Sequence, residues 1–145
     1  MQTASTPTIH VGAIEVRFLV EAEDCHGAAT VFECVVPADA RVPAPHSHDA
    51  FEETVYGLEG VSSFTVDGDT HDIGPGEAIC IRRGQVHHFV NQGRTDAKFL
   101  SVATPGIFGP AYFREIRDVL AASAGGPPDV AALVEVMRRH GLTPA

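Results

Sequence analysis

The sequence predicts an all-β fold, a closed sandwich or barrel of short strands followed by two short helices. Two observations carry this prediction. The middle of the chain alternates between apolar and polar residues in short runs broken by turn residues, and after Pro105-Gly106 the apolar residues recur with a period of about 3.6. Many short strands at near-regular spacing favour closure, because a closed sheet leaves no exposed edge. We expect a single domain over residues 1–145, with the barrel over about 9–104 and a helical tail over about 109–141.

The expected strands share an alternation that sends successive side chains to opposite faces of a sheet. They lie at residues 14–20, 30–36, 53–58, 61–66, 78–81, 87–90 and 98–104. Asp67-Gly68 is expected to close a tight hairpin, because a type I′ turn requires positive φ at its central residues. Glu59-Gly60 and Gly74-Pro75-Gly76 mark two further turns.

The tail is expected to form two helices that cover the barrel or make a subunit contact. The first begins near Pro110, a residue favoured at the first helical position, and carries Phe113, Ile116 and Leu120 on one face. The second runs from an N-cap at Asp129 to Gly141 just past its end. Its apolar stripe is expected to be Val130, Leu133, Val134 and Met137.

Composition and charge exclude several classes of protein. An apolar fraction of 44% argues against disorder. A formal net charge of −9, from 19 acidic and 10 basic residues, argues against nucleic-acid binding, which requires a cationic surface. No apolar run approaches the roughly 20 residues that span a bilayer, and Met1 to Pro7 lack the pattern of a signal peptide. We therefore expect a cytoplasmic protein with no nucleic-acid partner and no membrane partner.

The cysteines, Cys25, Cys34 and Cys80, are odd in number and are spaced like neither a zinc ribbon nor a CxxC redox pair. Free cysteine behaves as a small apolar residue that is usually buried. We therefore expect these residues to be free and buried.

Four residues form a candidate metal site: His46, His48, Glu53 and His87. On an extended segment His46 and His48 leave the same face, and inward faces of different strands converge inside a barrel. Imidazole together with carboxylate suits Fe(II), Mn(II), Co(II), Ni(II) or Zn(II). The remaining histidines are each isolated in the sequence and are expected to be ordinary solvated or hydrogen-bonded side chains: His10, His26, His71, His88 and His140.

Glu52 is the ambiguous neighbour of this site. Strand alternation sends Glu52 and Glu53 to opposite faces, so only one of the two carboxylates can be a ligand.

The spacing of these residues resembles the first sequence motif of the cupin family. That motif runs Gly, five residues, His-x-His, three or four residues, Glu, six residues, Gly. His46-x-His48, Glu53 and Gly60 fit it, and the interval to Gly60 favours Glu53 over Glu52 as the ligand. Ala40 stands where the motif has its first glycine, a departure at a turn position.

The second cupin motif runs Gly, five residues, Pro-x-Gly, two residues, His, three residues, Asn. Gly76, Gly84, His87 and Asn91 match it in register. Arg82 stands in place of the proline, which is expected to alter a turn without removing a ligand.

The resemblance implies a double-stranded β-helix, or jelly-roll barrel, with one divalent transition metal (Fe, Mn, Ni, Co or Zn) inside one open end. The implied ligands are His46, His48, Glu53 and His87. The stretches 45–48 and 54–56, with the helical tail, look most like small quercetin-dioxygenase-like cupins. That likeness implies a homodimeric oxidoreductase of the dioxygenase type, acting on a small enolisable or hydroxylated aromatic substrate, with Glu53 as the catalytic base.

Two alternatives stay open at this point. One is a non-redox metal-dependent isomerase, lyase or decarboxylase, and the other is a non-catalytic, metal-dependent small-molecule-binding protein. The candidate pocket residues are Phe51, Val55, Ile79, Ile81, Phe89, Asn91 and Phe99. Core packing is the favoured alternative for each aromatic candidate, and a structural hydrogen bond at a turn or strand end is the favoured alternative for Asn91. Arg82 and Arg83 could attract an anionic substrate or simply be solvated turn residues.

Overall fold

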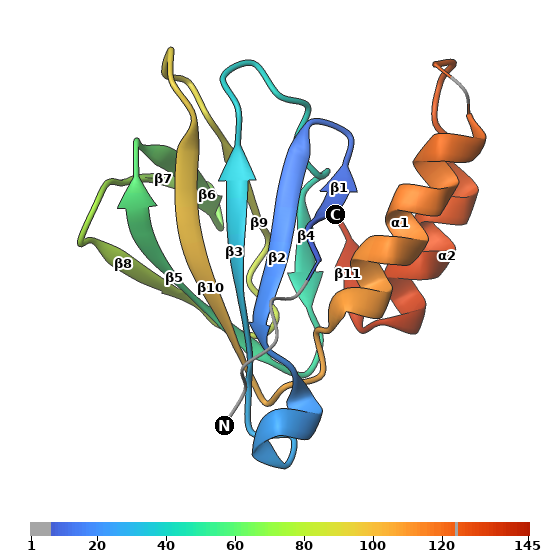
Figure 1. The fold of residues 1–145 in the computed structure, drawn as a ribbon, viewed down its shortest axis with the longest axis horizontal. Helices are drawn as coiled ribbons and strands as arrows, with labels where there is room; N and C mark the ends of the chain where they lie inside the picture. Colours follow the sequence, from blue (N-terminus) through green and yellow to red (C-terminus); the bar gives the residue numbers. More distant parts are fainter. Residues whose placement is uncertain (1–6, 124) are drawn as a thin grey trace.

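A computed structural model describes residues 7–123 and 125–145, and over these residues two β-sheets pack face to face with two helices beside them (Figure 1). The larger sheet consists, in spatial order, of β1 (Ile9–Val11), β2 (Ile14–Val20), β3 (Thr30–Val36), β10 (Ala97–Thr104), β5 (Glu52–Glu59) and β8 (Ala78–Ile81). The smaller sheet consists of β11 (Leu142–Pro144), β4 (His46–His48), β9 (His87–Val90), β6 (Ser62–Val66) and β7 (Asp69–Ile73). The helices are α1 (Pro110–Ala122) and α2 (Val130–Arg139), with a short 3₁₀ turn at Ala22–Cys25.

This architecture confirms the predicted all-β fold with two helices after it. The strands β2, β3, β8 and β9 begin and end where the alternation predicts. The sequence did not predict β1, β7 or β11. Strand β7 is exposed at all but its last residue, so it lies at the edge of its sheet and carries no alternating apolar face. The expectations about residues 1–6 and about Ala124 between the helices lie outside the described residues.

In two turns the backbone conformation explains which residue types are present. Asp67 and Gly68 have φ of 48° and 88°, as a hairpin between β6 and β7 requires. Ala40, in place of the motif glycine, needs no special backbone freedom because its neighbour Asp39 takes the left-handed conformation, with φ of 60°.

The side chains between the sheets form a largely apolar core. Val16, Phe18, Val36, Val55 and Ile81 are almost completely inaccessible. Cys34 shares this core, but Cys25 is only partly buried and Cys80 is exposed, so the prediction of buried cysteines is wrong for those two. Cys80 alternates outward on β8, beside the inward-facing Ile81.

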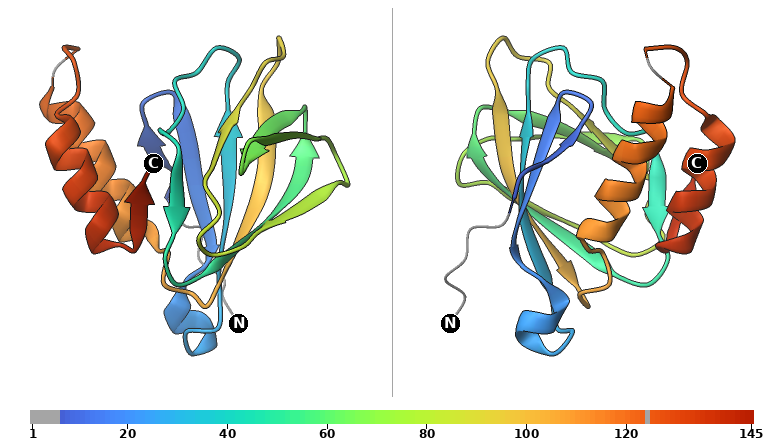
Figure 2. Two further views of the ribbon diagram at one scale, coloured as in Figure 1. Left: turned by 180° about the vertical axis from the view of Figure 1, so that it is seen from behind. Right: turned by 45° about the vertical axis from the view of Figure 1, so that its right-hand side comes forward.

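The helices lie at one side of the sandwich, with α1 against β1 of the larger sheet and α2 against β11 of the smaller sheet (Figure 2). The prediction for α1 is partly confirmed: Phe113 and Ile116 pack against the core, but Val119 joins them there and Leu120 does not. The predicted stripe of α2 is partly wrong: Met137 is buried, but Val130 is 65% exposed and Val136 is buried instead. The helix contacts the rest of the protein through its C-terminal half, where Arg139 pairs with Glu115 of α1. Within the described residues, no helix is long and apolar enough to cross a membrane.

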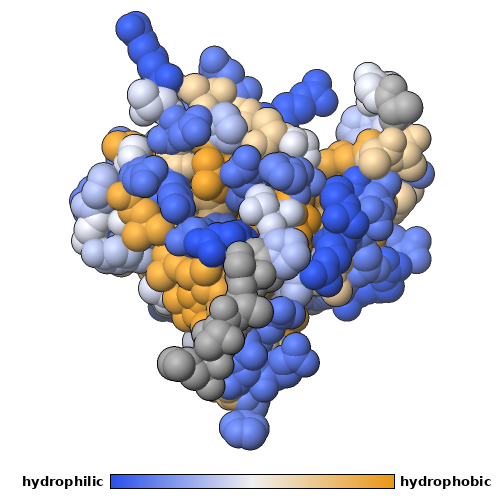
Figure 3. Space-filling view, in the orientation of Figure 1, coloured by the Kyte–Doolittle hydropathy of each residue, from blue (hydrophilic) through white to orange (hydrophobic). Residues whose placement is uncertain are grey.

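The outer face of the larger sheet mixes charged and apolar side chains (Figure 3). On it, Glu33 pairs with Arg17 at 2.8 Å and with Lys98 at 3.4 Å.

The structure contains a single copy of the chain, so the homodimer stays a prediction.

Gly57 of β5 should be intolerant of any side chain. A Cβ at this position would lie 2.0 Å from the carbonyl oxygen of Gly74, whose loop docks on Gly57 through backbone hydrogen bonds. Gly57→Ala is expected to lower the free energy of unfolding by about 2 kcal/mol or more, measured by urea denaturation. Gly109→Ala is the matched control, because no atom lies within 4 Å of its added Cβ. Equal stability of the two variants would contradict this close packing.

Candidate metal centre

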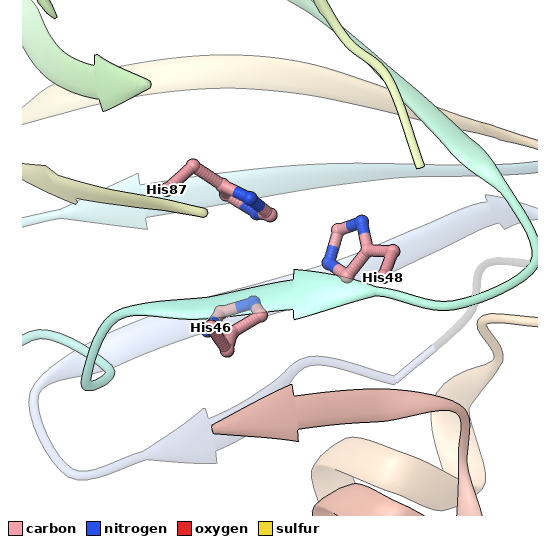
Figure 4. Close-up of side chains that lie close together, drawn as sticks. All are labelled: His46, His48 and His87. Atoms are coloured by element: carbon pink, nitrogen blue, oxygen red, sulfur yellow. The ribbon is translucent and has the colours of Figure 1, made fainter. Parts of the chain in front are cut away.

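Strand β4 and strand β9 bring three imidazoles together inside the sandwich. His46 pairs in register with His87, and His48 lies two residues further along the same face of β4. The ring centroids are 4.7 Å apart for His46 and His87 and 4.5 Å apart for His48 and His87. Figure 4 shows the three rings gathered around a common space. All three are buried, with at most 8% of their surface exposed.

Hydrogen bonds to the backbone fix the orientation of two of these rings. Nδ1 of His46 lies 2.8 Å from the carbonyl oxygen of Ala44, and Nδ1 of His87 lies 3.0 Å from that of Gln85. A carbonyl oxygen can only accept, so each Nδ1 carries the hydrogen and donates it. The Nε2 atom of each ring therefore has a free lone pair, which is the form of histidine that binds a metal.

His48 is the most unusual of the three. It is 1% exposed, and neither of its ring nitrogens has a hydrogen-bond partner among the described residues. The ring stacks on Phe51, with centroids 4.2 Å apart, and lies 5.6 Å from the ring of Phe108. A buried polar atom without a partner costs about 1–3 kcal/mol, so this arrangement calls for a compensating interaction.

Glu53 reaches the same space from the opposite sheet. Its Oε1 atom lies 3.7 Å from Nε2 of His48 and 3.8 Å from Nε2 of His87. Its other oxygen, Oε2, accepts a hydrogen bond of 2.5 Å from the hydroxyl of Ser101, which is completely buried on β10. The carboxylate is thus held at one oxygen and turned toward the histidines with the other.

Glu52 points away from this site. Arg83 donates to its carboxylate through Nε at 2.7 Å and through Nη2 at 2.6 Å, and these hydrogen bonds lower the pKa of Glu52 to about 2. The structure therefore agrees with the alternation argument that separates Glu52 from Glu53. Arg83 is half exposed, as the solvated-turn alternative predicts, and its ion pair with Glu52 ties the start of β5 to the turn before His87.

Burial controls the charges at the centre. It lowers the pKa of His46 and His87 below the ordinary value, and it lowers the pKa of His48 to about 2, with help from the neighbouring imidazoles. Burial raises the pKa of Glu53, opposed by the hydrogen bond from Ser101. The histidines are therefore neutral at neutral pH, and each ring has one protonated nitrogen and one nitrogen with a free lone pair.

These residues fit a transition-metal ion. Metal–ligand bonds of about 2.1 Å put neighbouring ligand atoms about 3–4 Å apart, and the Glu53–His48 and Glu53–His87 separations fall in that range. One nitrogen from each of His46, His48 and His87 lies within 4.8 Å of the others. A bound cation would also engage one of the two unpartnered nitrogens of His48. The buried three-histidine group is therefore compatible with a metal ion; ligation by Glu53 remains a prediction.

The predicted pocket residues divide into distinct groups. Phe51 packs directly on His48, and Val55 and Ile81 are buried in the core, with Ile79 partly so. Phe89 and Phe99 pack on each other and on Phe64, as the core-packing alternative predicts.

Asn91 makes structural hydrogen bonds at the end of a strand, which was one of the two roles predicted for it. Its Nδ2 donates to the carbonyl oxygens of Val36 and Thr95, and its Oδ1 accepts from the backbone of Gly93. The side chain is fully engaged in holding the end of β9.

The turn before His87 is intact despite Arg82. The backbone N–H of Arg82 donates to Oε1 of Gln85 at 2.9 Å, a bond that proline could not make. Gly84, with φ of 84°, donates to the carbonyl oxygen of His48 at 2.8 Å. The turn therefore still places His87 beside His46, and an effect of Arg82 on the shape of the turn stays a prediction.

Sequence reasoning missed three residues around the centre: Ser101, Phe108 and Tyr112. Ser101 alternates inward with Phe99 and Ala103 on β10, so strand parity could have identified it. Phe108 follows the last barrel strand outside any periodic pattern, and no sequence signal marks it. Tyr112 of α1 packs on Phe108, and burial together with the charge of Glu53 raises its pKa.

Comparison with known proteins agrees with this geometry. Residues 32–103 match the family described as "Cupin domain". The chain is 29% identical over 105 residues to quercetin 2,3-dioxygenase from Bacillus subtilis strain 168, a match that covers 70% of this chain and 29% of that enzyme. The chain therefore spans less than a third of the length of this curated relative.

Two solved structures are also similar. A predicted oxalate decarboxylase from Thermotoga maritima is 27% identical, with a TM-score of 0.60 over 63% of this chain and 80% of that one. The polyketide cyclase RemF from Streptomyces resistomycificus is 30% identical, with a TM-score of 0.57 over 70% of each chain. The reactions named in these relatives differ, so they agree on the fold and not on the chemistry.

Ser101 should control metal affinity through Glu53. Ser101→Ala removes the donor to Oε2 and leaves that oxygen buried without a partner. We expect metal affinity to fall about tenfold or more, measured by competition with a chromophoric chelator. Ser63→Ala is the control, because Ser63 donates its hydrogen bond to Asp72 on the other sheet. Unchanged affinity in Ser101→Ala would show that Glu53 does not need this support.

The metal-free protein should lose stability below neutral pH. The folded state keeps His48 neutral, while the unfolded chain protonates it near its ordinary pKa of 6.5. Above pH 6.5 His48 is neutral in both states, so the free energy of unfolding carries no penalty from it. As pH falls from 6.5 toward the folded pKa, the free energy of unfolding drops by about 1.4 kcal/mol per pH unit. Glu53 contributes the opposite slope, so His48→Asn is compared with wild type by urea denaturation. The variant should show the shallower pH dependence, and identical slopes would contradict burial of neutral His48.

Proposed function

The chain belongs to the cupin family, and from that premise we propose that it is a metal-dependent enzyme of the dioxygenase type. The proposed substrate is a small enolisable or hydroxylated aromatic molecule. The proposed cofactor is one divalent transition-metal ion held by His46, His48, His87 and Glu53.

One observation supports the proposal above the others: neutral imidazole nitrogens converge with one carboxylate oxygen in a buried space. Nitrogen ligands with a single anionic oxygen suit Fe(II), Mn(II), Co(II) and Ni(II), as well as Zn(II). The candidate ligand cluster among the described residues consists of His46, His48 and His87. It includes no cysteine, so the proposed site has no thiolate ligand. When bound, the metal would supply Lewis acidity and a template for the reacting groups.

Glu53 is the proposed base. Burial raises the pKa of its carboxyl group, which makes the carboxylate a better proton acceptor near neutral pH. Ser101 donates to Oε2, so the lone pairs of Oε1 face the interior space in which a substrate hydroxyl or enol would lie. A carboxylate can both coordinate and accept a proton if it rotates off the metal, so the proton would then pass from the substrate oxygen to Oε1 of Glu53.

The walls of the site favour an aromatic substrate. Phe51 stacks on His48, Phe108 stacks on Phe51 with centroids 5.2 Å apart, and Tyr112 packs on Phe108. Aromatic rings bind one another in offset or edge-to-face arrangements and exclude water from the reacting groups. The B. subtilis relative carries the name of an enzyme for an aromatic substrate, quercetin.

A non-redox reaction is the second candidate. The relatives include a predicted oxalate decarboxylase and a polyketide cyclase, and the same ligand set can polarise a carbonyl or carboxylate group without oxygen. Glu53 would keep its role as proton acceptor in that case. Dependence on oxygen therefore separates the two candidates.

Glu53→Gln tests the proposed base. In metal-loaded protein assayed with a flavonol such as quercetin or with a β-diketone, we expect kcat to fall at least about 100-fold, because an amide cannot accept the proton. Glu52→Gln is the matched control, since Glu52 pairs with Arg83 outside the site and its loss should leave turnover unchanged. Oxygen uptake and product formation are measured together.

Three outcomes would overturn parts of the proposal. Full activity of Glu53→Gln at full metal content would remove the base role. Equal turnover without oxygen would replace the dioxygenase with a non-redox enzyme. Tight binding of such compounds without any turnover would favour a metal-dependent small-molecule-binding protein.

A further inference from the structure

Strand β4, which carries His46 and His48, is held in its sheet mainly by the last strand of the fold. On one side it pairs with β9 at a single registered position, His46 with His87. On its other side β11 pairs along its whole length, with Leu142 opposite His48, Thr143 opposite Ser47 and Pro144 opposite His46. Figure 4 shows β11 lying alongside the strand that bears His46 and His48.

Hydrogen bonds continue this pairing beyond both ends of β4. The N–H of Asp49 donates to the carbonyl oxygen of Gly141 at 2.8 Å, and the N–H of Ala145 donates to that of Pro45 at 3.0 Å. The hydroxyl of Thr143 donates to Oδ1 of Asp49 at 2.7 Å. On the side of β9, the N–H of Gly84 donates to the carbonyl oxygen of His48.

The strand β11 is itself anchored through the helices. Leu142 is completely buried, and α2 ends immediately before it with Met137 also buried. Glu115 of α1 accepts a hydrogen bond from Arg139 and pairs with His140, which lies two residues before β11. Helices and strand therefore form one arm, residues 110–123 and 125–145, that meets the barrel at two places: α1 packs against β1 and the core, and β11 pairs with β4.

We propose that β11 is a positioning element of the metal centre, so that metal binding and docking of β11 on β4 are coupled. The proposal rests on the proposed metal site, but not on the reaction carried out there. A strand of three residues does not hold its geometry alone, whereas a metal requires His46 and His48 to stay fixed relative to His87. Because coupling between two binding events is reciprocal, a bound metal must strengthen the docking of β11 by the same factor that docking strengthens metal binding.

Amide hydrogen exchange of the full chain, with and without Co(II), tests this coupling. At a free Co(II) concentration about 100 times its Kd, openings that break the site should become up to about 100-fold rarer. Exchange should therefore slow in residues 46–49 and also in residues 141–145. The edge strand β7, at the other side of the same sheet, should be unaffected.

Thr143 provides the variant. Thr143→Val removes the hydrogen bond to Asp49 with little change in shape, and in metal-free protein the Asp49 amide should exchange about threefold to tenfold faster. Thr143→Ser keeps the hydroxyl and should restore the wild-type rate. Thr70→Val is the matched control, because Thr70 makes a comparable side-chain bond, to Thr65, on the edge strand β7.

The outcomes separate this inference from the proposed function. If wild-type protein binds Co(II) and protects residues 87–90 but not residues 141–145, the coupling is wrong and the metal site stands. Exchange at Asp49 that is unchanged in Thr143→Val would overturn the positioning role in the same way. If wild-type protein binds no Co(II), the proposed metal function fails and the coupling fails with it.

Discussion

The burial of three neutral imidazoles around one carboxylate is the constraint on which the rest of the structure depends. Desolvation keeps His46, His48 and His87 from taking up protons, and the backbone carbonyls of Ala44 and Gln85 engage Nδ1 in two of the rings. Lone pairs therefore face the interior, and the two buried ring nitrogens of His48 have no hydrogen-bond partner among the described residues. Such an arrangement opposes folding unless a ligand compensates it, and a divalent cation does so most directly.

The two sheets contribute different residues to this centre. The smaller sheet supplies the histidines from β4 and β9, and the larger sheet supplies Glu53, held by Ser101 on the neighbouring strand. The contact between Glu52 and Arg83 joins the start of β5 to the turn before His87, so both sheets are tied together at the edge of the site. Aromatic side chains from the loop before α1 and from α1 itself then close the space beside His48.

Much of this could be predicted from the sequence, for identifiable physical reasons. Alternation located most barrel strands, and it separated Glu53 from Glu52 because neighbouring residues of a strand face opposite sides. Strand β11 was missed because three residues are too short for a pattern, and pairing with β4 depends on how the helices return the chain. Val130 was misplaced because amphipathic spacing identifies an apolar stripe but not which part of a helix meets the core. The roles of Phe108 and Tyr112 depend on tertiary packing, which local sequence does not encode.

The most direct test of the account is the metal stoichiometry of the purified chain, compared with that of His48→Ala. The account predicts one equivalent of a divalent transition metal in wild type. It predicts a large loss in the variant, because His48 is the ligand whose buried nitrogens have no other described partner. Wild-type protein without bound metal under metal-replete conditions, or a His48→Ala variant with an unchanged equivalent, would contradict the central claim.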